Sequence, residues 1–384
     1  MNELFKRNLT LDRDENETFF LWGPRQTGKS TLLTENYPDA FWVDLLKPEE
    51  FRRYMERPEI LREEVKLKGC KFVVIDEIQK VPSLLDQVHW LHENESIHFA
   101  LCGSSARKVK RGHANLLGGR AIRYELFGLS LSECSKKISL LELLNRGYLP
   151  RISRSTQYKR LQNSYVATYL KEEIAEEGLV RRLPIFSEFL AMAALSDTET
   201  TNFSTIARDT GVSSETIKSY YDILCDTMVG RFLPSYRRRP KRRVASAPKF
   251  YFSDVGIVNH LAKRGTIESG SELYGKAFEN WVFHELNAYN IYMERFADIF
   301  YWQLSSGIEV DFIINHIDLA IEVKSSKAIK SSHIKGLRQL IVDHPETKRR
   351  IMVSGEAKSR MTEDGIEVLS ANDFVSELWQ GTLF

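Results

Sequence analysis

Residues Gly23–Ser30, which read GPRQTGKS, constrain the fold of this chain more than any other segment. An apolar run, FFLW, precedes them, and a helix-forming run, STLLTEN, follows from Ser30. A glycine-rich turn between a strand and a helix presents backbone N–H groups at the positive end of the helix dipole, where phosphate groups bind. The segment therefore predicts a phosphate-binding loop (Walker A motif) at the edge of a parallel sheet.

The residue types in this loop assign specific roles. We expect Lys29 to reach the terminal phosphates of a nucleotide and to assist catalysis, and the Ser30 hydroxyl to ligate Mg²⁺. The whole set expected to contact the nucleotide is Gly23, Pro24, Arg25, Gln26, Thr27, Gly28, Lys29, Ser30 and Thr31.

An acidic pair follows a second apolar run, Phe72–Ile75. Open α/β sheets bind their ligands at the carboxyl ends of the strands, which is where Asp76 would emerge (Walker B motif). We expect Asp76 to hold Mg²⁺ and Glu77 to activate a water molecule. A carboxylate beside the magnesium aspartate favours hydrolysis over transfer to an acceptor substrate.

A further strand ends in the sequence LCGSSAR, from Leu101 to Arg107. A small polar residue here can contact the γ-phosphate and the attacking water, and Ser104 is preferred to Ser105 for this role. Arg107 is the catalytic arginine that we expect, with Arg120 and Arg123 as alternatives that sense the γ-phosphate or reach a neighbouring subunit. A solvated basic face is the competing interpretation of all three arginines.

Apolar runs alternate with amphipathic stretches in the first third of the chain, which indicates a parallel sheet covered by helices on both faces. The predicted strands are 18–22, 41–44, 72–75, 97–102 and 123–127, and the predicted helices are 29–35, 48–68 and 83–92. Residues 129–224 have helical periodicity, with helices expected over 140–144, 158–170 and 185–194. After them we expect a β-ribbon over 231–252, a helix over 274–286 and strands over 299–303, 309–315 and 319–324.

The composition describes a folded chain without a dominant charge. The 384 residues include 54 lysines and arginines against 52 aspartates and glutamates, a net charge of +2, so only local patches indicate a charged partner. No segment approaches the roughly 20 apolar residues that cross a bilayer, and the N-terminus lacks the apolar core of a secretory signal. The four cysteines lie far apart, which favours reduced core thiols and a cytoplasmic location without membrane contact.

The middle of the chain carries two features typical of nucleic-acid binding. Residues 203–217 read as helix, turn, helix, with Gly211 at the turn and Ser213 as the N-cap of the second helix. The expected exposed face of that helix bears two acids, Glu215 and Asp222, against one base, Lys218, which suits phosphate contacts poorly. A packing unit without DNA contact is therefore an equal alternative.

The β-ribbon is the one strongly basic segment, because no acidic residue lies between Asp226 and Asp254. It contains Arg231 and Lys249, and six further bases crowd into seven positions. Such a cluster predicts salt-sensitive, sequence-independent DNA binding. A solvated hairpin tip or an acidic protein partner is the alternative. The six residues are Arg237, Arg238, Arg239, Lys241, Arg242 and Arg243.

The last third contains residues typical of a metal-dependent nuclease. A strand with Asp311 is followed eleven positions later by Glu322-Val323-Lys324, and the strand period of two sets Glu322 and Lys324 on one face. We expect Asp311 and Glu322 to hold Mg²⁺ with Lys324 beside the attacking water, and Glu279 on the preceding helix to add a ligand. The alternative is an inactive fold in which these carboxylates pair with Lys324.

Taken together, these segments resemble a prokaryotic family of AAA-type ATPases with a C-terminal domain of unknown function. The resemblance covers nearly the whole chain and rests on LWGPRQTGKSTLL, FVVIDEIQKVP, LCGSSARK, GGRAIRYELFGLSLSE, YFSDVGIVNHLA, GKAFENWVFHEL, EVDFII and AIEVKSS. It implies ATP as the nucleotide and a C-terminal fold like that of restriction endonucleases (PD-(D/E)xK nucleases). AAA-type cores often form rings, so a homo-oligomer is consistent with it.

These observations predict an α/β protein of three domains. Residues 1–145 form a P-loop ATPase core, 146–255 a helical and winged-helix region with the basic ribbon, and 256–384 a restriction-endonuclease-like domain. The predicted function is Mg²⁺-dependent ATP hydrolysis coupled to nucleic-acid binding, with nuclease activity left open. The alternative is a nucleotide-driven switch or scaffold that binds proteins, with the nuclease-like domain inert.

Overall fold

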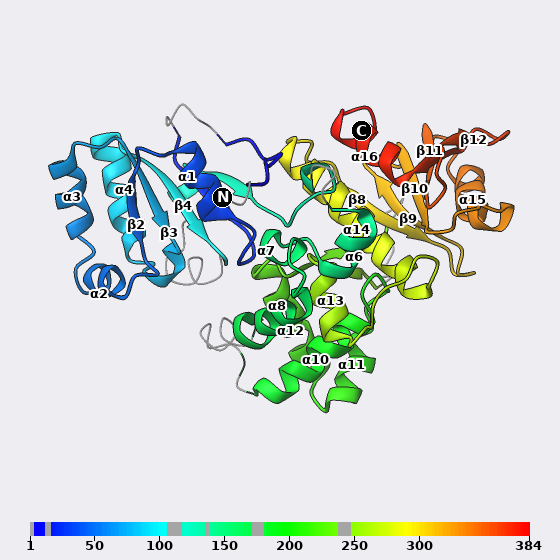
Figure 1. The fold of residues 1–384 in the computed structure, drawn as a ribbon, viewed down its shortest axis with the longest axis horizontal. Coiled ribbons are helices and arrows are strands. Elements are labelled where there is room, and N and C mark those ends of the chain that lie inside the picture. The colour runs from blue at the N-terminus through cyan, green and yellow to red at the C-terminus, as the bar shows by residue number, and fades with distance from the viewer. Residues whose placement is uncertain are drawn as a thin grey trace. The chain divides into compact units, whose positions relative to one another are not determined.

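The computed structural model describes residues 4–11, 17–105, 117–134, 138–170, 180, 182–236 and 247–384 (Figure 1). The chain forms two compact units. The N-terminal unit comprises Lys6–Gly128 and Ile223–Val229, and the C-terminal unit comprises Met1–Phe5, Leu129–Asp222 and Gly230–Phe384. The predicted α/β class, with a parallel sheet first, a helical middle and a C-terminal sheet, is confirmed.

The sheet of the N-terminal unit is entirely parallel, with the order β2-β3-β4-β1-β5. The five predicted strands all form, within two residues of the expected ends. Both β1 and β3 are buried along their whole length, as the uninterrupted apolar runs require. The strands are β1 (Phe19–Trp22), β2 (Phe41–Asp44), β3 (Phe72–Asp76), β4 (His98–Gly103) and β5 (Ile122–Glu125).

One prediction for this unit is wrong, because a segment expected to form one helix forms two. The sequence predicts a single helix over residues 48–68, but the structure has α2 (Pro48–Glu56) and α3 (Ile60–Lys68). Pro58 disfavours the helical conformation of the residue before it, and Arg57 accordingly leaves the helix with φ −139°. The other helices are α1 (Lys29–Asn36), the 3₁₀ turn η1 (Ile78–Lys80) and α4 (Leu84–Glu95).

The helical part of the C-terminal unit contains the predicted helix-turn-helix. Helix α11 (Phe203–Thr210) ends at Gly211, whose φ of 68° lies in the left-handed region that favours glycine. Helix α12 (Ser214–Asp226) follows, and its N-cap Ser213 accepts a hydrogen bond from the Thr216 N–H at 3.1 Å. The helices that precede this motif in the chain are α6 (Leu140–Arg146), α7 (Pro150–Ser153), α8 (Tyr158–Ser164), a π-helical continuation (Tyr165–Leu170) and α10 (Leu183–Leu195).

The predicted β-ribbon is present as an antiparallel pair, β6 (Gly230–Leu233) and β7 (Lys249–Phe252). It leads into α13 (Val255–Leu261) and the long helix α14 (Glu272–Tyr292). The intervening predicted DNA-binding residues, which are Arg237, Arg238, Arg239, Lys241, Arg242 and Arg243, lie outside the described residues.

A mixed sheet of order β12-β13-β11-β10-β9-β8 forms the core of the C-terminal unit. The three predicted strands appear as β8 (Ile299–Gln303), β9 (Glu309–Ile314) and β10 (Leu319–Lys324). The elements after residue 324 were not predicted from the sequence. These are the 3₁₀ turn η5 (Ser331–Ile334), α15 (Lys335–Asp343), β11 (Arg349–Ser354), β12 (Arg360–Met361), β13 (Glu367–Ser370) and α16 (Ala371–Trp379).

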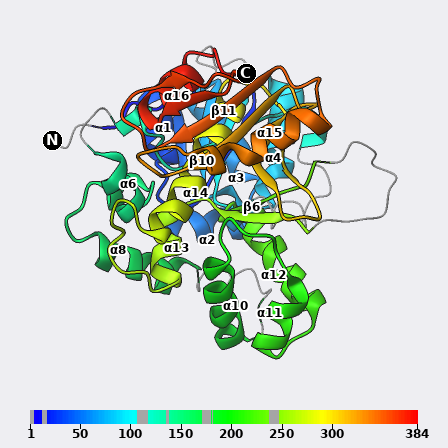
Figure 2. The same ribbon diagram turned by 90° about the vertical axis from the view of Figure 1, so that its right-hand side faces the viewer.

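Alternation of side chains sends the two faces of this sheet to different hydrophobic clusters. Ile321 and Val323 of β10 pack with Trp281 of α14, whereas Ala320 packs with Leu337 of α15. Figure 2 shows these helices beside β10 and β11. A sheet covered on both faces fixes the strand register, because a shift of one residue would exchange the two faces.

The four cysteines are free, but only Cys102 and Cys134 are buried, so the prediction of core thiols fits two of the four. Within the described part of the chain, no helix is both long enough and apolar enough to cross a membrane.

Asp254 holds together two segments of the C-terminal unit that are far apart in sequence. Its Oδ2 accepts hydrogen bonds from the N–H groups of Tyr148 at 2.6 Å and Leu149 at 3.0 Å, and its Oδ1 accepts from Gly256 and Ile257 at the start of α13. Gly147 has a φ of 88°, and a Cβ there would lie 2.2 Å from Oδ1. The carboxylate thus caps α13 and fixes the turn after α6.

We predict that Asp254→Ala lowers the free energy of unfolding by about 2–4 kcal/mol, because it removes a helix cap and leaves buried N–H groups without an acceptor. Urea unfolding followed by circular dichroism measures the change. Glu268→Ala, which alters an exposed carboxylate of the same unit, is the control. Equal stability of the two variants would contradict this account.

Candidate functional site

The predicted phosphate loop joins β1 to α1, as its sequence requires. Gly28 is the N-cap of α1 with a φ of 96°, a conformation that favours glycine. At Gly23 a Cβ atom would lie 2.3 Å from the carbonyl oxygen of Leu126. These two glycines are therefore needed for the backbone path itself.

Polar side chains of the loop point inward. The buried Lys29 ammonium donates to the carbonyl oxygens of Gly23 at 2.8 Å and Pro24 at 3.0 Å. The Thr27 hydroxyl donates to the same Pro24 oxygen at 2.9 Å. Lys29 is thereby held within the curve of the loop, where a bound phosphate chain would be located.

Arg7 supports this loop from outside the motif. Its guanidinium donates to the carbonyl oxygen of Thr27 at 2.6 Å and to that of Phe127, just after β5, at 2.7 Å. Arg7 was not predicted as part of the site, because it lies 20 residues from Thr27 and no local pattern connects them.

The two predicted magnesium ligands of the ATPase site are in direct contact. The Ser30 hydroxyl, at the start of α1, donates to Asp76 Oδ2 at the end of β3 at 2.6 Å. The other oxygen, Asp76 Oδ1, is buried and has no hydrogen-bond partner among the described residues. A hydroxyl, a carboxylate and an unsatisfied buried oxygen fit Mg²⁺, which takes oxygen ligands.

Glu77 lies beside Asp76 and is connected to the end of β4 by a residue that the sequence analysis did not single out. Its backbone is in the left-handed region, with φ 60°, and its carboxylate accepts a hydrogen bond from the Gln79 side chain. The same Gln79 nitrogen donates to the Ser104 hydroxyl at 3.1 Å. The structure therefore brings the predicted base and the predicted sensor serine together through Gln79.

The space around Gln79 is tightly defined. A Cβ on Gly103 would lie 2.4 Å from Gln79 Oε1, and that oxygen is buried without a hydrogen-bond partner in the described part of the chain. Gln79 lies on the short turn η1, and Glu77 is the N-cap of that turn. The nearness of the two residues can be read from the sequence, but the contact of Gln79 with Ser104, 25 positions away, cannot.

The predicted arginines fall into two groups. Arg120 pairs with Glu93 and Arg123 with Glu125, each at 2.7 Å, so both take part in ion pairs of their own unit. Arg107, the preferred candidate, lies outside the described residues, and its role stays a prediction.

In the C-terminal unit, the hairpin of β9 and β10 brings the predicted nuclease residues together. Asp311 Oδ2 accepts a hydrogen bond from the Val323 N–H at 2.8 Å, and Lys324 pairs with the buried Glu322 at 2.8 Å. Burial, and next the nearby Asp311, raise the pKa of Glu322 well above its ordinary value. The metal-ligand roles of Glu279, Asp311 and Glu322 stay a prediction.

Lys249 does not belong to an exposed basic ribbon, which corrects its interpretation from the sequence. Its side chain is only 4% exposed, and its ammonium donates to Glu279 at 3.2 Å and to Glu309, with Asp311 Oδ1 at 3.7 Å. Burial alone would lower the pKa of Lys249, but the carboxylates of Glu279, Asp311 and Glu309 raise it above its ordinary value. Partial burial raises the pKa of Glu279 to about 7.

The carboxylates of Glu279, Glu309 and Asp311 fit a metal ion less well than the ATPase site does. Over the described ranges, no three histidine, cysteine, aspartate or glutamate side chains are grouped so that they could hold a metal ion. The centre of Glu279, Glu309 and Asp311 is taken by an ammonium group instead.

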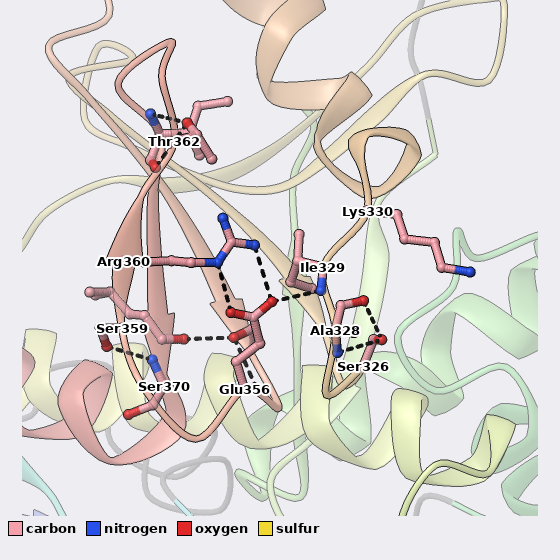
Figure 3. Close-up of polar contacts among 12 residues, drawn as sticks. Ser326, Ala328, Ile329, Lys330, Glu356, Ser359, Arg360, Thr362 and Ser370 are labelled. Atoms are coloured by element: carbon pink, nitrogen blue, oxygen red, sulfur yellow. Dashed lines mark hydrogen bonds and ion pairs between the residues drawn. The ribbon is translucent and has the colours of Figure 1, made fainter.

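Glu356 connects the loop that follows β10 to the loop that follows β11, at the carboxyl edge of the C-terminal sheet. Figure 3 shows it between the guanidinium of Arg360 and the backbone of Ile329. The Arg360 hydrogen bond holds the pKa of Glu356 below its ordinary value. This contact gives the two loops a defined shape.

Family models match three successive parts of the chain. Residues 15–135 match an AAA domain, residues 138–268 a domain of unknown function (DUF8612) and residues 274–374 another domain of unknown function (DUF4143). The match over residues 15–135 supports an AAA-type P-loop ATPase domain in this part of the chain. The nuclease-like character of the third part stays a prediction.

Proteins that match more than half of this chain share little sequence identity with it. An uncharacterized protein of Haemophilus influenzae is 23% identical over 323 residues, which are 79% of this chain and 77% of that protein. A signal transduction ATPase with numerous domains and a tetratricopeptide repeat sensor, from Pyrococcus horikoshii, is 12% identical with a TM-score of 0.22; the match covers 75% of this chain and spans 48% of that structure. A replication initiator, DnaA, solved with AMPPCP and single-stranded DNA, is 13% identical with a TM-score of 0.27, covering 56% of this chain and 83% of that one.

We predict that Gln79→Leu leaves nucleotide binding intact and lowers the turnover number about 10- to 100-fold, because Glu77 loses the amide that orients it. Steady-state ATP hydrolysis measures the turnover number, and fluorescent-nucleotide titration measures binding. Gln87→Leu, the same substitution on α4, is the control. Turnover equal to that of the control would show that Gln79 does not position Glu77.

Proposed function

We propose that the chain binds ATP with Mg²⁺ and hydrolyses it at the site formed by the phosphate loop and the ends of β3 and β4. The observation that carries this proposal is the hydrogen bond between Ser30 and Asp76, with Asp76 Oδ1 left unsatisfied beside it. These two side chains lie at the positive end of α1, next to Lys29, so phosphate and metal would be bound side by side.

Different residues of the site bind the phosphates, hold the metal and activate the water molecule. The N–H groups and Lys29 of the loop orient the phosphate chain, and Ser30 with Asp76 would hold Mg²⁺. The bound metal would neutralise charge that develops on the phosphate oxygens. Glu77 orients a water molecule and accepts its proton, and Ser104 contacts that water or the γ-phosphate.

ATP rather than GTP is favoured by the match of residues 15–135 to an AAA domain. The sequence also lacks an NKxD element, which reads guanine, after the LCGSSAR segment. An assembly of several copies is consistent with Arg107 acting on a neighbouring subunit.

Two substitutions separate binding from chemistry. Lys29→Ala should abolish nucleotide binding, because the ammonium that faces the phosphates is lost. Glu77→Gln should bind ATP but hydrolyse it about 100-fold more slowly or worse, since the amide cannot accept a proton. Nucleotide titration and steady-state hydrolysis measure the two effects. Normal turnover in Glu77→Gln would assign the base to another residue.

We further propose that hydrolysis is coupled to nucleic acid through the basic residues between β6 and β7. What supports this is their density, six bases within residues 237–243, in a chain whose net charge is only +2. The antiparallel pairing of Leu233 with Lys249 sets both ends of this segment side by side. A basic cluster of this kind gives affinity that falls with salt.

DNA should therefore stimulate ATP hydrolysis at low salt, and the stimulation should fade as salt rises. Replacing Arg237, Arg238, Arg239, Arg242 and Arg243 with serine should remove it, whereas replacing the same residues with lysine should preserve most of it, because the charge remains. Hydrolysis rates over a salt series measure this. Equal stimulation of the serine variant would exclude the basic segment as the DNA contact.

A second candidate function is a nucleotide-driven switch that binds protein partners and whose nuclease-like domain is inert. Two observations favour it. The exposed face of α12 bears Glu215 and Asp222 beside Lys218, which is unfavourable for DNA. The carboxylates of the C-terminal unit are engaged by Lys249. A hydrolysis rate that DNA leaves unchanged would favour this candidate.

A further inference from the structure

The carboxylate cluster of the C-terminal unit receives its cation from a distant part of the chain. Lys249 lies on β7, whereas Glu279 is on α14 and both Glu309 and Asp311 are on β9. The Lys249 ammonium approaches all three, at 3.2 Å from Glu279, in hydrogen-bond contact with Glu309 and at 3.7 Å from Asp311. A lysine is almost never buried to this extent unless it is paired, so these contacts are the reason that it can lie here.

Donors other than Lys249 also contact these three carboxylates. Tyr251, two residues after Lys249, donates to the same Glu279 oxygen at 2.7 Å. Glu309 Oε2 accepts from the Gln303 side chain at 3.0 Å, and Asp311 Oδ2 from the Val323 N–H at 2.8 Å. These donors orient the carboxylates toward the ammonium.

We propose that Lys249 is the resident cation of this cluster, and that it excludes divalent metal from the site which the nuclease-like residues would otherwise form. The proposal is independent of ATP hydrolysis. An ion entering between Glu279 and Asp311 would meet the ammonium at a few ångströms, where repulsion between cations is strong. Because Lys249 is part of the chain, its ammonium also competes with a free metal ion for these carboxylates at a high effective concentration.

Glu322 does not supply enough ligands to bind a metal ion while Lys249 is present. Its Oε2 is buried and without a hydrogen-bond partner among the described residues, but its Oε1 is paired with Lys324. One carboxylate oxygen is far from the near-octahedral oxygen set that Mg²⁺ demands. Removal of Lys249 should therefore be necessary to free enough ligands.

The test is Mn²⁺ binding to the full chain, followed by the electron paramagnetic resonance signal of free Mn²⁺. Nucleotide is left out, and every protein carries Asp76→Asn so that the ATPase site contributes no binding. Lys249→Met should bind one Mn²⁺ at least about tenfold more tightly than its Lys249 parent, because a cation beside the ion has been removed. Adding Asp311→Asn to Lys249→Met should abolish the gain.

Two control variants test whether the effect requires loss of the positive charge at position 249 in particular. Lys324→Met removes the same charge from the partner of Glu322 and should leave Mn²⁺ binding weak, because Lys249 remains. Lys249→Arg retains the cation and should also bind weakly. Should Lys249→Met fail to fold, Lys249→Met with Glu309→Gln leaves one fewer carboxylate unpaired and is measured in its place.

Saturable Mn²⁺ binding by the Lys249 parent that disappears with Asp311→Asn would overturn the proposal. Folded Lys249→Met and Lys249→Met/Glu309→Gln proteins that bind Mn²⁺ no better than the parent would overturn it as well.

Discussion

The parallel order of β2-β3-β4-β1-β5 is the constraint on which the nucleotide site depends. Parallel strands end at one edge of a sheet, so the phosphate loop after β1 meets Asp76 at the end of β3 and Ser104 after β4. The three segments of the site are far apart in sequence, and the sheet brings them together. The hydrogen bond from Ser30 to Asp76 spans 46 positions and joins the two motifs directly.

Buried carboxylates and a buried lysine of the C-terminal unit are satisfied largely by partners from other segments of the chain. Asp254 receives backbone N–H groups from the turn after α6, and Glu285 accepts hydrogen bonds from Leu131 and from Trp281 and Trp379. Lys249 is enclosed by carboxylates from α14 and β9. Since an unpaired charge in the interior is costly, each of these contacts fixes two segments relative to each other within its unit.

The sequence allowed the phosphate loop, the strands of the parallel sheet and the helix-turn-helix to be predicted, because each is specified by local residue types and periodicity. The break at Pro58 was also readable there, but the amphipathic pattern on both sides of it suggested one helix. Arg7, Gln79 and Lys249 could not be predicted in the same way. Their roles depend on contacts across the fold, and burial turns Lys249 from an apparent surface base into an internal ion pair.

Isothermal titration of the full chain with a non-hydrolysable ATP analogue, in Mg²⁺ and again in EDTA, tests the central claim most directly. The account predicts one nucleotide per chain, bound at least about tenfold more tightly with Mg²⁺. It further predicts that Asp76→Asn removes this difference, because Ser30 and Asp76 would hold the metal. Absence of binding, or equal affinity in Mg²⁺ and EDTA, would contradict the assignment of this site.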